Sequence, residues 1–353
     1  MIEAERDSMF AAGSRMLLLF RIAAVFALGA CGCQISLGQE VQARAEAMLE
    51  HADELSDIRS PNAPPFRLAA SFAITDKDLN RVEGSFTEVW VSDTRWRSET
   101  VVNNLHRIEV VGATRRWLRN GGETFPERAA RVGMELQFLP RAAAKFQFAS
   151  IDDHSDKDPP YECAVSKRGE HLEVSAFCVD KKSGILIETA VPELRPTKLE
   201  ESLRPVEHTC SYADFKRFGD FWFPREVECE EDGHKEISIH VTNLTAELSP
   251  DPALFTPPES AVELANCHGS LVPPTAITTP QPKSPKLYSD QGRVFVELVV
   301  DTKGRPQNVR VVDSGGNKKN DELAVETVQT WHFKPAICDG EAVPSSTMVI
   351  LEF

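Results

Sequence analysis

The sequence predicts an α+β protein with two units: a larger one, in which a helix precedes a curved antiparallel β meander, and a smaller one of order β-β-α-β. Three observations predict this class. Runs rich in β-branched and aromatic residues, separated by short polar turns, follow one another along most of the chain. Apolar positions recur at helical spacing near the start of the larger unit and near the end of the chain. A length of 353 residues also exceeds one typical domain, so two hydrophobic cores are expected.

Changes in composition predict the boundaries of these units. Residues 1–38 form a leader, residues 39–260 the larger unit, residues 261–284 a proline-rich linker and residues 285–353 the smaller unit. Prolines are frequent in Leu271–Pro285, where they favour extended polyproline geometry. We therefore expect a short spacer between the two units.

The first 38 residues have the layout of a secretory signal or a membrane anchor. Met16–Ile35 is apolar apart from Arg21, and arginines precede it. Three outcomes stay open: cleavage after Gly38, lipidation at Cys31 in the run Leu28–Cys31, and retention as a spanning helix. Retention is the least favoured, because Arg21 is costly at membrane depth. Each outcome predicts export, and we expect membrane association through the N-terminus.

The larger unit opens with a helix and continues as a meander. Apolar residues of Val41–Leu55 lie on one helical face, and Ser60–Pro61 ends the segment. A second short helix is expected at Pro126–Leu139. The strands are predicted at Phe66–Thr75, Arg81–Val91, Arg95–Val102, Leu105–Val111, Tyr161–Val165, Leu172–Val179, Ile185–Thr189, His208–Phe215, Phe221–Cys229 and Glu236–Leu244.

This helix and meander, with Trp96–Glu99 on the third strand and a closing turn at Leu254–Pro257, resemble the lipoprotein-carrier fold of the LolA and LolB class. The resemblance implies a half-open barrel with an apolar cavity for acyl chains, and hence lipid as an alternative ligand. The aromatic residues that would line such a cavity are Phe72, Phe86, Trp90, Trp96 and Trp117. Alternating aromatic residues in strands more often belong to an ordinary core.

The smaller unit begins with a hairpin. Arg293–Asp301 and Gln307–Ser314 are strand-like, and Gly304 lies in the loop that joins them. Asn320 is the expected N-cap of a following amphipathic helix. After a turn, Thr347–Phe353 is strongly strand-like.

At these residues the chain resembles the C-terminal domain of TonB, the energy transducer of Gram-negative envelopes. The motif residues that carry the resemblance are Tyr288, Gly304, Trp331, Phe333 and Pro335. The chain departs from the family at Ser289, where a proline is usual. It also lacks the long proline-rich spacer and the polar histidine motif of a membrane helix through which that family couples to a motor.

The resemblance implies that an extended segment of an outer-membrane receptor, or of another envelope protein, adds as a strand beside the last strand of this chain. An exposed edge carries unpaired N–H and C=O groups that template such an addition. The predicted partner-binding residues are Thr347, Met348, Val349, Ile350, Leu351, Glu352 and Phe353.

Six cysteines follow the leader, and an even number in an exported chain predicts disulfides. Six thiols allow 15 connectivities in principle. The favoured pairs are Cys163 with Cys178, Cys210 with Cys229, and Cys267 with Cys338. The alternative for any pair is two buried free thiols.

The sequence gives little support for nucleic-acid binding, metal binding or catalysis. The formal net charge of −15 argues against a nucleic-acid partner, because phosphate contacts need clustered Lys and Arg. His234 and His240 share one face of a strand, but spacing places no third metal ligand beside them. No phosphate-binding glycine loop, dinucleotide fingerprint or nucleophile elbow is present. We expect no catalytic residue, metal or cofactor.

These observations together predict a non-enzymatic envelope protein that takes part in transmembrane transport through partner binding at its C-terminal unit. The alternative is a periplasmic lipid or lipoprotein carrier that uses the larger unit. The sequence alone leaves both functions open.

Overall fold

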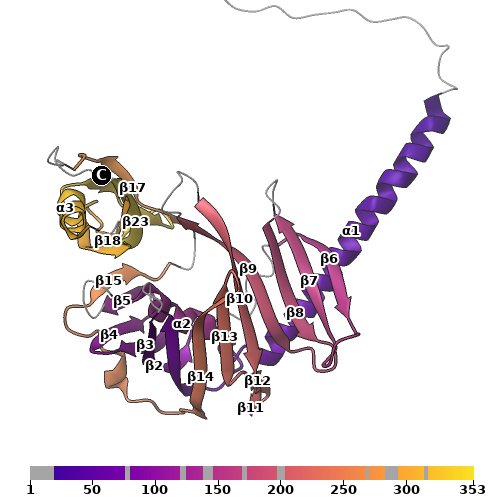
Figure 1. The fold of residues 1–353 in the computed structure, drawn as a ribbon, viewed down its shortest axis with the longest axis horizontal. Helices are drawn as coiled ribbons and strands as arrows, with labels where there is room; N and C mark the ends of the chain where they lie inside the picture. The colour runs from indigo at the N-terminus through magenta and orange to yellow at the C-terminus, as the bar shows by residue number, and fades with distance from the viewer. Residues whose placement is uncertain are drawn as a thin grey trace, which may run out of the picture.

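The computed structural model describes residues 20–75, 80–119, 125–137, 146–168, 173–196, 203–267, 270–282, 293–313 and 317–353. Tyr288, the beginning of the leader and some predicted strand ends lie outside these residues. The described part is dominated by antiparallel sheet, with one long helix at its N-terminal end (Figure 1).

The larger unit is built on one curved antiparallel sheet, whose strand order in the described residues is β15-β5-β4-β3-β2-β1-β14-β13-β10-β9-β8-β7-β6 (Figure 1). Consecutive strands are mostly neighbours, as expected for a meander. The bounds are β1 Phe66–Thr75, β2 Arg81–Ser92, β3 Arg95–Val102, β4 Leu105–Val111, β5 Arg115–Arg119, β6 Phe148–His154, β7 Tyr161–Arg168, β8 Glu173–Asp180, β9 Leu186–Pro196, β10 Leu203–Ala213, β13 Glu226–Glu231, β14 His234–Ala246 and β15 Val262–Ala265.

Two helices pack on this sheet and share one hydrophobic core. α1 (Phe20–Ser56) buries Ala45, Leu49 and Ala52 completely, and α2 (Glu127–Gln137) adds its own apolar face. Phe86 lies in the same core, so close to Gly133 of α2 that a Cβ at this glycine would meet the Phe86 ring at 3.0 Å. Among the described residues, none of the helices combines the length and apolar character that crossing a bilayer requires.

The aromatic residues considered as a cavity lining belong mostly to this core. Phe72, Phe86 and Trp90 are buried in it, and Trp96 packs against it while remaining partly exposed. Trp117 on β5 is also partly exposed. The positions of these rings therefore agree with ordinary core packing.

One predicted strand, Phe221–Cys229, is wrong as a single element. The chain breaks at Pro224, which has no N–H to donate to a ladder. Before the break, β12 (Phe221–Phe223) pairs with β11 (Lys216–Phe218) in a small hairpin that is separate from the large sheet in the described residues. After the break, β13 enters the large sheet.

The smaller unit has a three-stranded sheet of order β19-β18-β23, covered by one helix. Its long elements are β18 (Arg293–Val300), β19 (Pro306–Asp313), α3 (Lys318–Val328) and β23 (Ser345–Glu352). Three short strands that the sequence did not predict lie between α3 and β23. They are β20 His332–Lys334, β21 Ala336–Cys338 and β22 Glu341–Val343.

The N-cap of α3 differs from the predicted one. The helix begins three residues earlier, and the side chain of Asn317 accepts a hydrogen bond of 3.0 Å from the N–H of Lys319. Asn320 instead lies inside the first turn and is buried. Both asparagines precede acidic residues, so the sequence pattern fits either start.

Parts of the predicted linker pair with the large sheet and with short strands of the smaller unit. β15 extends the large sheet beside β5, whereas β16 (Leu271–Val272) and β17 (Thr275–Thr278) pair with β21 and β20 of the smaller unit. The physical reason is that the residues between the prolines keep their N–H donors and include β-formers. The segment therefore connects the two units without being a free spacer.

Candidate functional site

The last long strand, β23, lies at an edge of the smaller sheet. It pairs antiparallel with β18, from Ser345 opposite Val300 to Glu352 opposite Arg293. Within the described residues, β18 is the only strand paired with β23. In an antiparallel pair, each strand directs only alternate residues toward its neighbour. The N–H and C=O groups of the other residues on β23 therefore face away from β18.

Side chains alternate along β23 between the core and the solvent. Leu351 is buried in the core of the smaller unit, and Val349 packs against the same core. Met348 and Ile350 point the other way, with exposed fractions of 57% and 47%. Side chains of a guest strand paired with β23 could contact these two apolar side chains on the solvent-facing side of the sheet.

Three other predicted edge residues contact β18 or the core of the smaller unit. Thr347 lies opposite Leu298 on β18, and Phe353 packs partly against the core. The carboxylate of Glu352 forms an exposed ion pair of 3.2 Å with Arg293. These contacts fix the register of β23 on β18.

The start of β23 is tied to the larger unit. The N–H of Ala265, at the end of β15, donates a 3.0 Å hydrogen bond to the carbonyl oxygen of Pro344. A cavity of about 20 Å³, room for roughly one water molecule, lies nearby between Leu264 and Ser346. The contact with the larger unit thus occupies the beginning of the strand, whereas Met348 and Ile350 are exposed farther along it.

The motif residues around Trp331 connect the hairpin loop and the predicted linker to the core of the smaller unit. Trp331 and Phe333 are buried in the core, and the indole N–H of Trp331 donates to the carbonyl of Pro280 at 3.1 Å. The N–H of Phe333 donates to the carbonyl of Gly304 at 2.9 Å. Pro335 separates β20 from β21. The motif therefore anchors the predicted linker and the hairpin loop to one core.

Asp301 shapes the loop between β18 and β19. Its Oδ1 accepts from the N–H groups of Lys303 and Arg305, and its Oδ2 accepts from the guanidinium of Arg305 at 2.9 Å. Partial burial alone would raise the pKa of Asp301, but these hydrogen bonds and the charge of Arg305 lower it overall. The carboxylate form is thus favoured in the folded hairpin.

The structure contains the three disulfides that the sequence favoured. Two are cross-strand pairs within the large sheet, Cys163–Cys178 on β7 and β8 and Cys210–Cys229 on β10 and β13. The third, Cys267–Cys338, joins the segment after β15 to β21 of the smaller unit. This last bridge and the bond to Pro344 connect the two units covalently and by hydrogen bonding.

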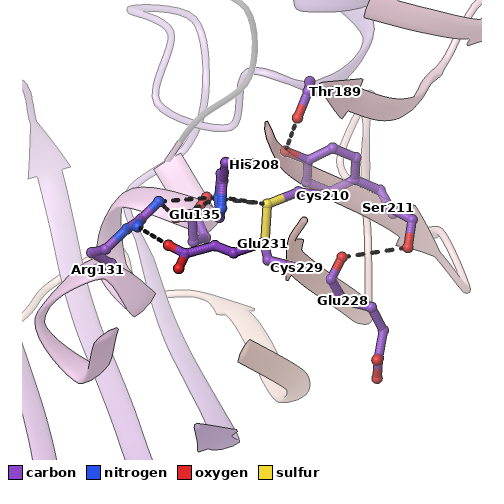
Figure 2. Close-up of a disulfide and its surroundings, with 10 residues drawn as sticks. Arg131, Glu135, Thr189, His208, Cys210, Ser211, Glu228, Cys229 and Glu231 are labelled. Atoms are coloured by element: carbon purple, nitrogen blue, oxygen red, sulfur yellow. Dashed lines mark hydrogen bonds and ion pairs between the residues drawn. A yellow bond between two sulfur atoms is a disulfide. The ribbon is translucent and has the colours of Figure 1, made fainter. Parts of the chain in front are cut away.

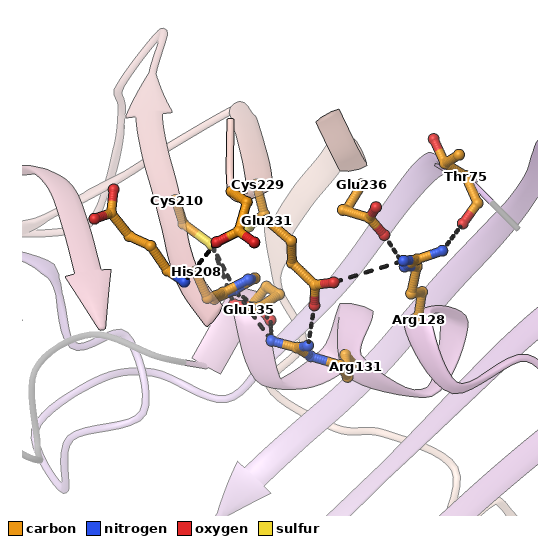
Figure 3. Close-up of polar contacts among 11 residues, drawn as sticks. Thr75, Arg128, Arg131, Glu135, His208, Cys210, Cys229, Glu231 and Glu236 are labelled. Atoms are coloured by element: carbon orange, nitrogen blue, oxygen red, sulfur yellow. Dashed lines mark hydrogen bonds and ion pairs between the residues drawn. A yellow bond between two sulfur atoms is a disulfide. The ribbon is translucent and has the colours of Figure 1, made fainter. Parts of the chain in front are cut away.

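Sequence reasoning missed a buried polar cluster beneath α2 (Figures 2 and 3). Arg131 donates to Glu135, one turn later on the helix, and to Glu231 on β13, both at 3.2 Å. Its Nη2 lies 3.1 Å from Nε2 of His208 on β10. Arg128 continues the network to Glu236 on β14. Buried charges need such partners, so the cluster fixes α2 on the sheet.

The signal for this cluster in the sequence was faint. Arg131 and Glu135 have helical i,i+4 spacing, but His208 and Glu231 come together with them only through the fold. The pair His234 and His240, by contrast, was noted in the sequence but forms no such cluster in the described residues. His240 Nδ1 contacts the carboxylate of Glu226 at 2.6 Å, and His234 is exposed, consistent with a solvated strand face.

Comparison with protein families identifies the smaller unit. Residues 282–353 match the family model described as the Gram-negative bacterial TonB protein C-terminal. The resemblance expected from the motif residues is therefore confirmed for this part of the chain. The match begins three residues before the predicted boundary. No curated protein is similar to the chain at a significant level.

Comparison with solved structures gives distant likenesses. A LolA superfamily protein from Nitrosomonas europaea is 11% identical, covers 60% of this chain and 97% of its own, and has a TM-score of 0.39. A DUF1329 family protein from Desulfovibrio piger is 10% identical, covers 63% of this chain and 96% of its own, and has a TM-score of 0.40.

Proposed function

We propose that this chain is a non-enzymatic protein of the cell envelope, whose C-terminal unit binds an extended segment of an outer-membrane transporter by strand addition. In this proposal the leader of residues 1–38 directs export, and the receiving edge is β23. The observation that carries the proposal is the position of β23, which pairs on one side with β18 and has no second partner strand among the described residues.

Two further observations support this function. The family match of residues 282–353 is to a domain of Gram-negative TonB proteins, which supports an envelope location and an outer-membrane partner. Met348 and Ile350 form an exposed apolar pair along the same strand. Backbone pairing would supply affinity for any extended segment, and contacts with these two side chains would favour apolar residues at alternate positions of the guest.

Site-specific photocrosslinking in cells tests the proposal. A photoreactive phenylalanine analogue is placed at Ile350 of the full chain, and crosslinked proteins are identified by mass spectrometry. The expected product is an adduct with the periplasmic segment of an outer-membrane transporter. Ile277 on β17 is the control position, because it is also exposed, at 60%, but lies in a different sheet.

Two outcomes contradict the proposal. One is the absence of any transporter adduct from Ile350, and the other is the same adduct at equal yield from Ile277. Native mass spectrometry of the purified chain addresses the carrier alternative. Bound lipid at one molecule per chain, together with no transporter adduct, would favour a carrier over a partner-binding protein.

A further inference from the structure

The disulfide Cys210–Cys229 lies beside two side chains of types that can bind metals, and the other cross-strand pair has no such neighbours in the described residues. Nε2 of His208 is 3.2 Å from Sγ of Cys210, and Oε2 of Glu135 is 3.4 Å from the same sulfur (Figure 2). One ligand atom from each of Glu135, His208, Cys210 and Cys229 lies within 4.8 Å of all the others, and all four residues are buried. Two sulfurs, one imidazole and one carboxylate are a donor set that suits tetrahedral Zn²⁺.

The orientation of His208 fits the role of a ligand. Its Nε2 faces the site and lies 3.1 Å from Nη2 of Arg131 and 3.3 Å from Oε1 of Glu135. The other ring nitrogen, Nδ1, is buried and has no hydrogen-bond partner among the described residues. The imidazole thus directs Nε2 toward the sulfur of Cys210 and the carboxylate of Glu135, and a metal ion bound there would take the place of the Arg131 contact at this nitrogen.

We propose that the chain holds one Zn²⁺ ion on Glu135, His208, Cys210 and Cys229 when the Cys210–Cys229 disulfide is reduced. A dithiol reductant supplies two electrons and two protons, which convert the disulfide to two thiols while the reductant itself becomes a disulfide. Zn²⁺ then displaces the two thiol protons, which pass to solvent. In the oxidised chain the sulfurs are bonded to each other, so the two states exclude one another.

The charges around the site suit a bound ion. Two thiolates and the Glu135 carboxylate carry three negative charges, and Zn²⁺ leaves one of them uncompensated. Arg131 lies at the site with its Nη2 3.2 Å from Glu135 and contributes positive charge there. Glu231 binds the other side of the Arg131 guanidinium and holds it in place (Figure 3).

The other two disulfides provide matched controls. Cys163 and Cys178 also face each other across two strands and are buried, but no further metal-binding side chains gather around them in the described part of the chain. Among the described residues, Cys267 and Cys338 have only Asp339 beside them as a further ligand type, and this group is partly exposed. Neither pair completes a four-ligand buried set.

Cobalt substitution tests the proposal on the full chain. The protein is prepared under tris(carboxyethyl)phosphine, a reductant that becomes a phosphine oxide by taking oxygen from water, and Co²⁺ is added as the probe. We expect one Co²⁺ per chain, with the visible bands of tetrahedral coordination and a thiolate charge-transfer band. The oxidised protein should show neither. Zn²⁺ should displace Co²⁺ and remove both signals.

Variants assign the site. The Cys210→Ser/Cys229→Ser variant should lose the bands, whereas Cys163→Ser/Cys178→Ser and Cys267→Ser/Cys338→Ser should keep them. His208→Ala should weaken Co²⁺ binding by at least about tenfold, since even outer-shell substitutions cost that much. Equal bands from the oxidised chain, or bands that persist without Cys210 and Cys229, would overturn the proposal.

A folding failure of the serine variant leaves the test intact. Circular dichroism identifies that failure. The separate variants His208→Ala and Glu135→Gln then test the metal site, because each of them retains the two thiols. Unchanged Co²⁺ affinity in both of them would also overturn the proposal.

Discussion

Gly304 shows how one residue position determines the loop next to the C-terminal core. Its φ is +77°, a region that glycine adopts freely and other residues rarely do. A Cβ at this position would meet the carbonyl oxygen of Phe333 at 1.9 Å. Both the turn and the close approach of two backbones therefore require glycine. The sequence predicted the loop, but the contact with Phe333 is visible only in the folded chain.

Replacing Gly304 by alanine should destabilise the smaller unit by about 2 kcal/mol or more, because the strain of a positive φ and a backbone clash add together. Urea unfolding followed by circular dichroism measures the loss. Gly340→Ala is the control, since its φ is +91° but the space around it is open. Equal losses in the two variants would show that the approach to Phe333 is unimportant.

Asp301 gives a pH dependence with a definite sign. Its pKa is lowered in the folded state, so the stability that it contributes is present above the unfolded-state pKa, near 4, and is lost as the pH falls through the folded-state value. Asp301→Asn should reduce the free energy of unfolding at pH 7 by about 1 kcal/mol. The deficit should shrink as the pH falls below 4. A deficit that stays constant down to pH 2 would contradict this account.

At the level of single residues, the sequence prediction succeeded for the cysteines and failed for the buried polar cluster. The six cysteines after the leader paired as predicted, because strands and spacing placed each pair across a turn or beside one motif. The cluster of Arg131, Glu135, His208 and Glu231 was not predicted, because its members approach one another only when α2 lies on the sheet.

At the scale of elements, the sequence pattern predicted strands well where the run of strand-like residues was long. Three predicted strands, Phe66–Thr75, Arg95–Val102 and Leu105–Val111, coincide with β1, β3 and β4. Short strands such as β16 and β17 escaped notice, because prolines surround them and two to four residues carry no measurable period. Their pairing depends on strands β21 and β20, which come much later in the chain.

The cap of α3 offers a test at this scale. Asn317→Ala should lower the stability of the smaller unit by about 1 kcal/mol, because it removes the acceptor for the N–H of Lys319. Asn317→Asp should retain most of the stability, since aspartate caps helices equally well. Thermal unfolding measures both variants. Equal stability of the Asn317→Ala and Asn317→Asp variants would indicate that another residue, such as Asn320, caps the helix.

For the whole molecule, the relation between the units is the feature that composition did not predict. Parts of the expected spacer pair with the large sheet and with short strands of the smaller unit, and Cys267–Cys338 closes a loop with a sequence separation of 71 residues. A bridge over a long loop removes more entropy from the unfolded chain than one over a short loop. The two units are therefore expected to unfold together while the bridge is intact.

Cys267→Ser/Cys338→Ser should reduce the free energy of unfolding by about 4 kcal/mol, compared with about 3 kcal/mol for Cys163→Ser/Cys178→Ser, whose separation is 15. Only the first variant should also separate the unfolding transitions of the two units, which calorimetry resolves. A single transition in both variants would show that strand pairing alone couples the units.

Residue-resolved hydrogen exchange of the amides in Ser345–Glu352 tests the account most directly. In the isolated protein, alternate amides of β23 should exchange slowly, because they pair with β18, and those between them should exchange rapidly. Addition of the transporter segment identified by crosslinking should slow the rapid set. Uniformly slow exchange along the strand in the isolated protein, or rapid amides that the segment leaves unchanged, would contradict the proposed strand addition.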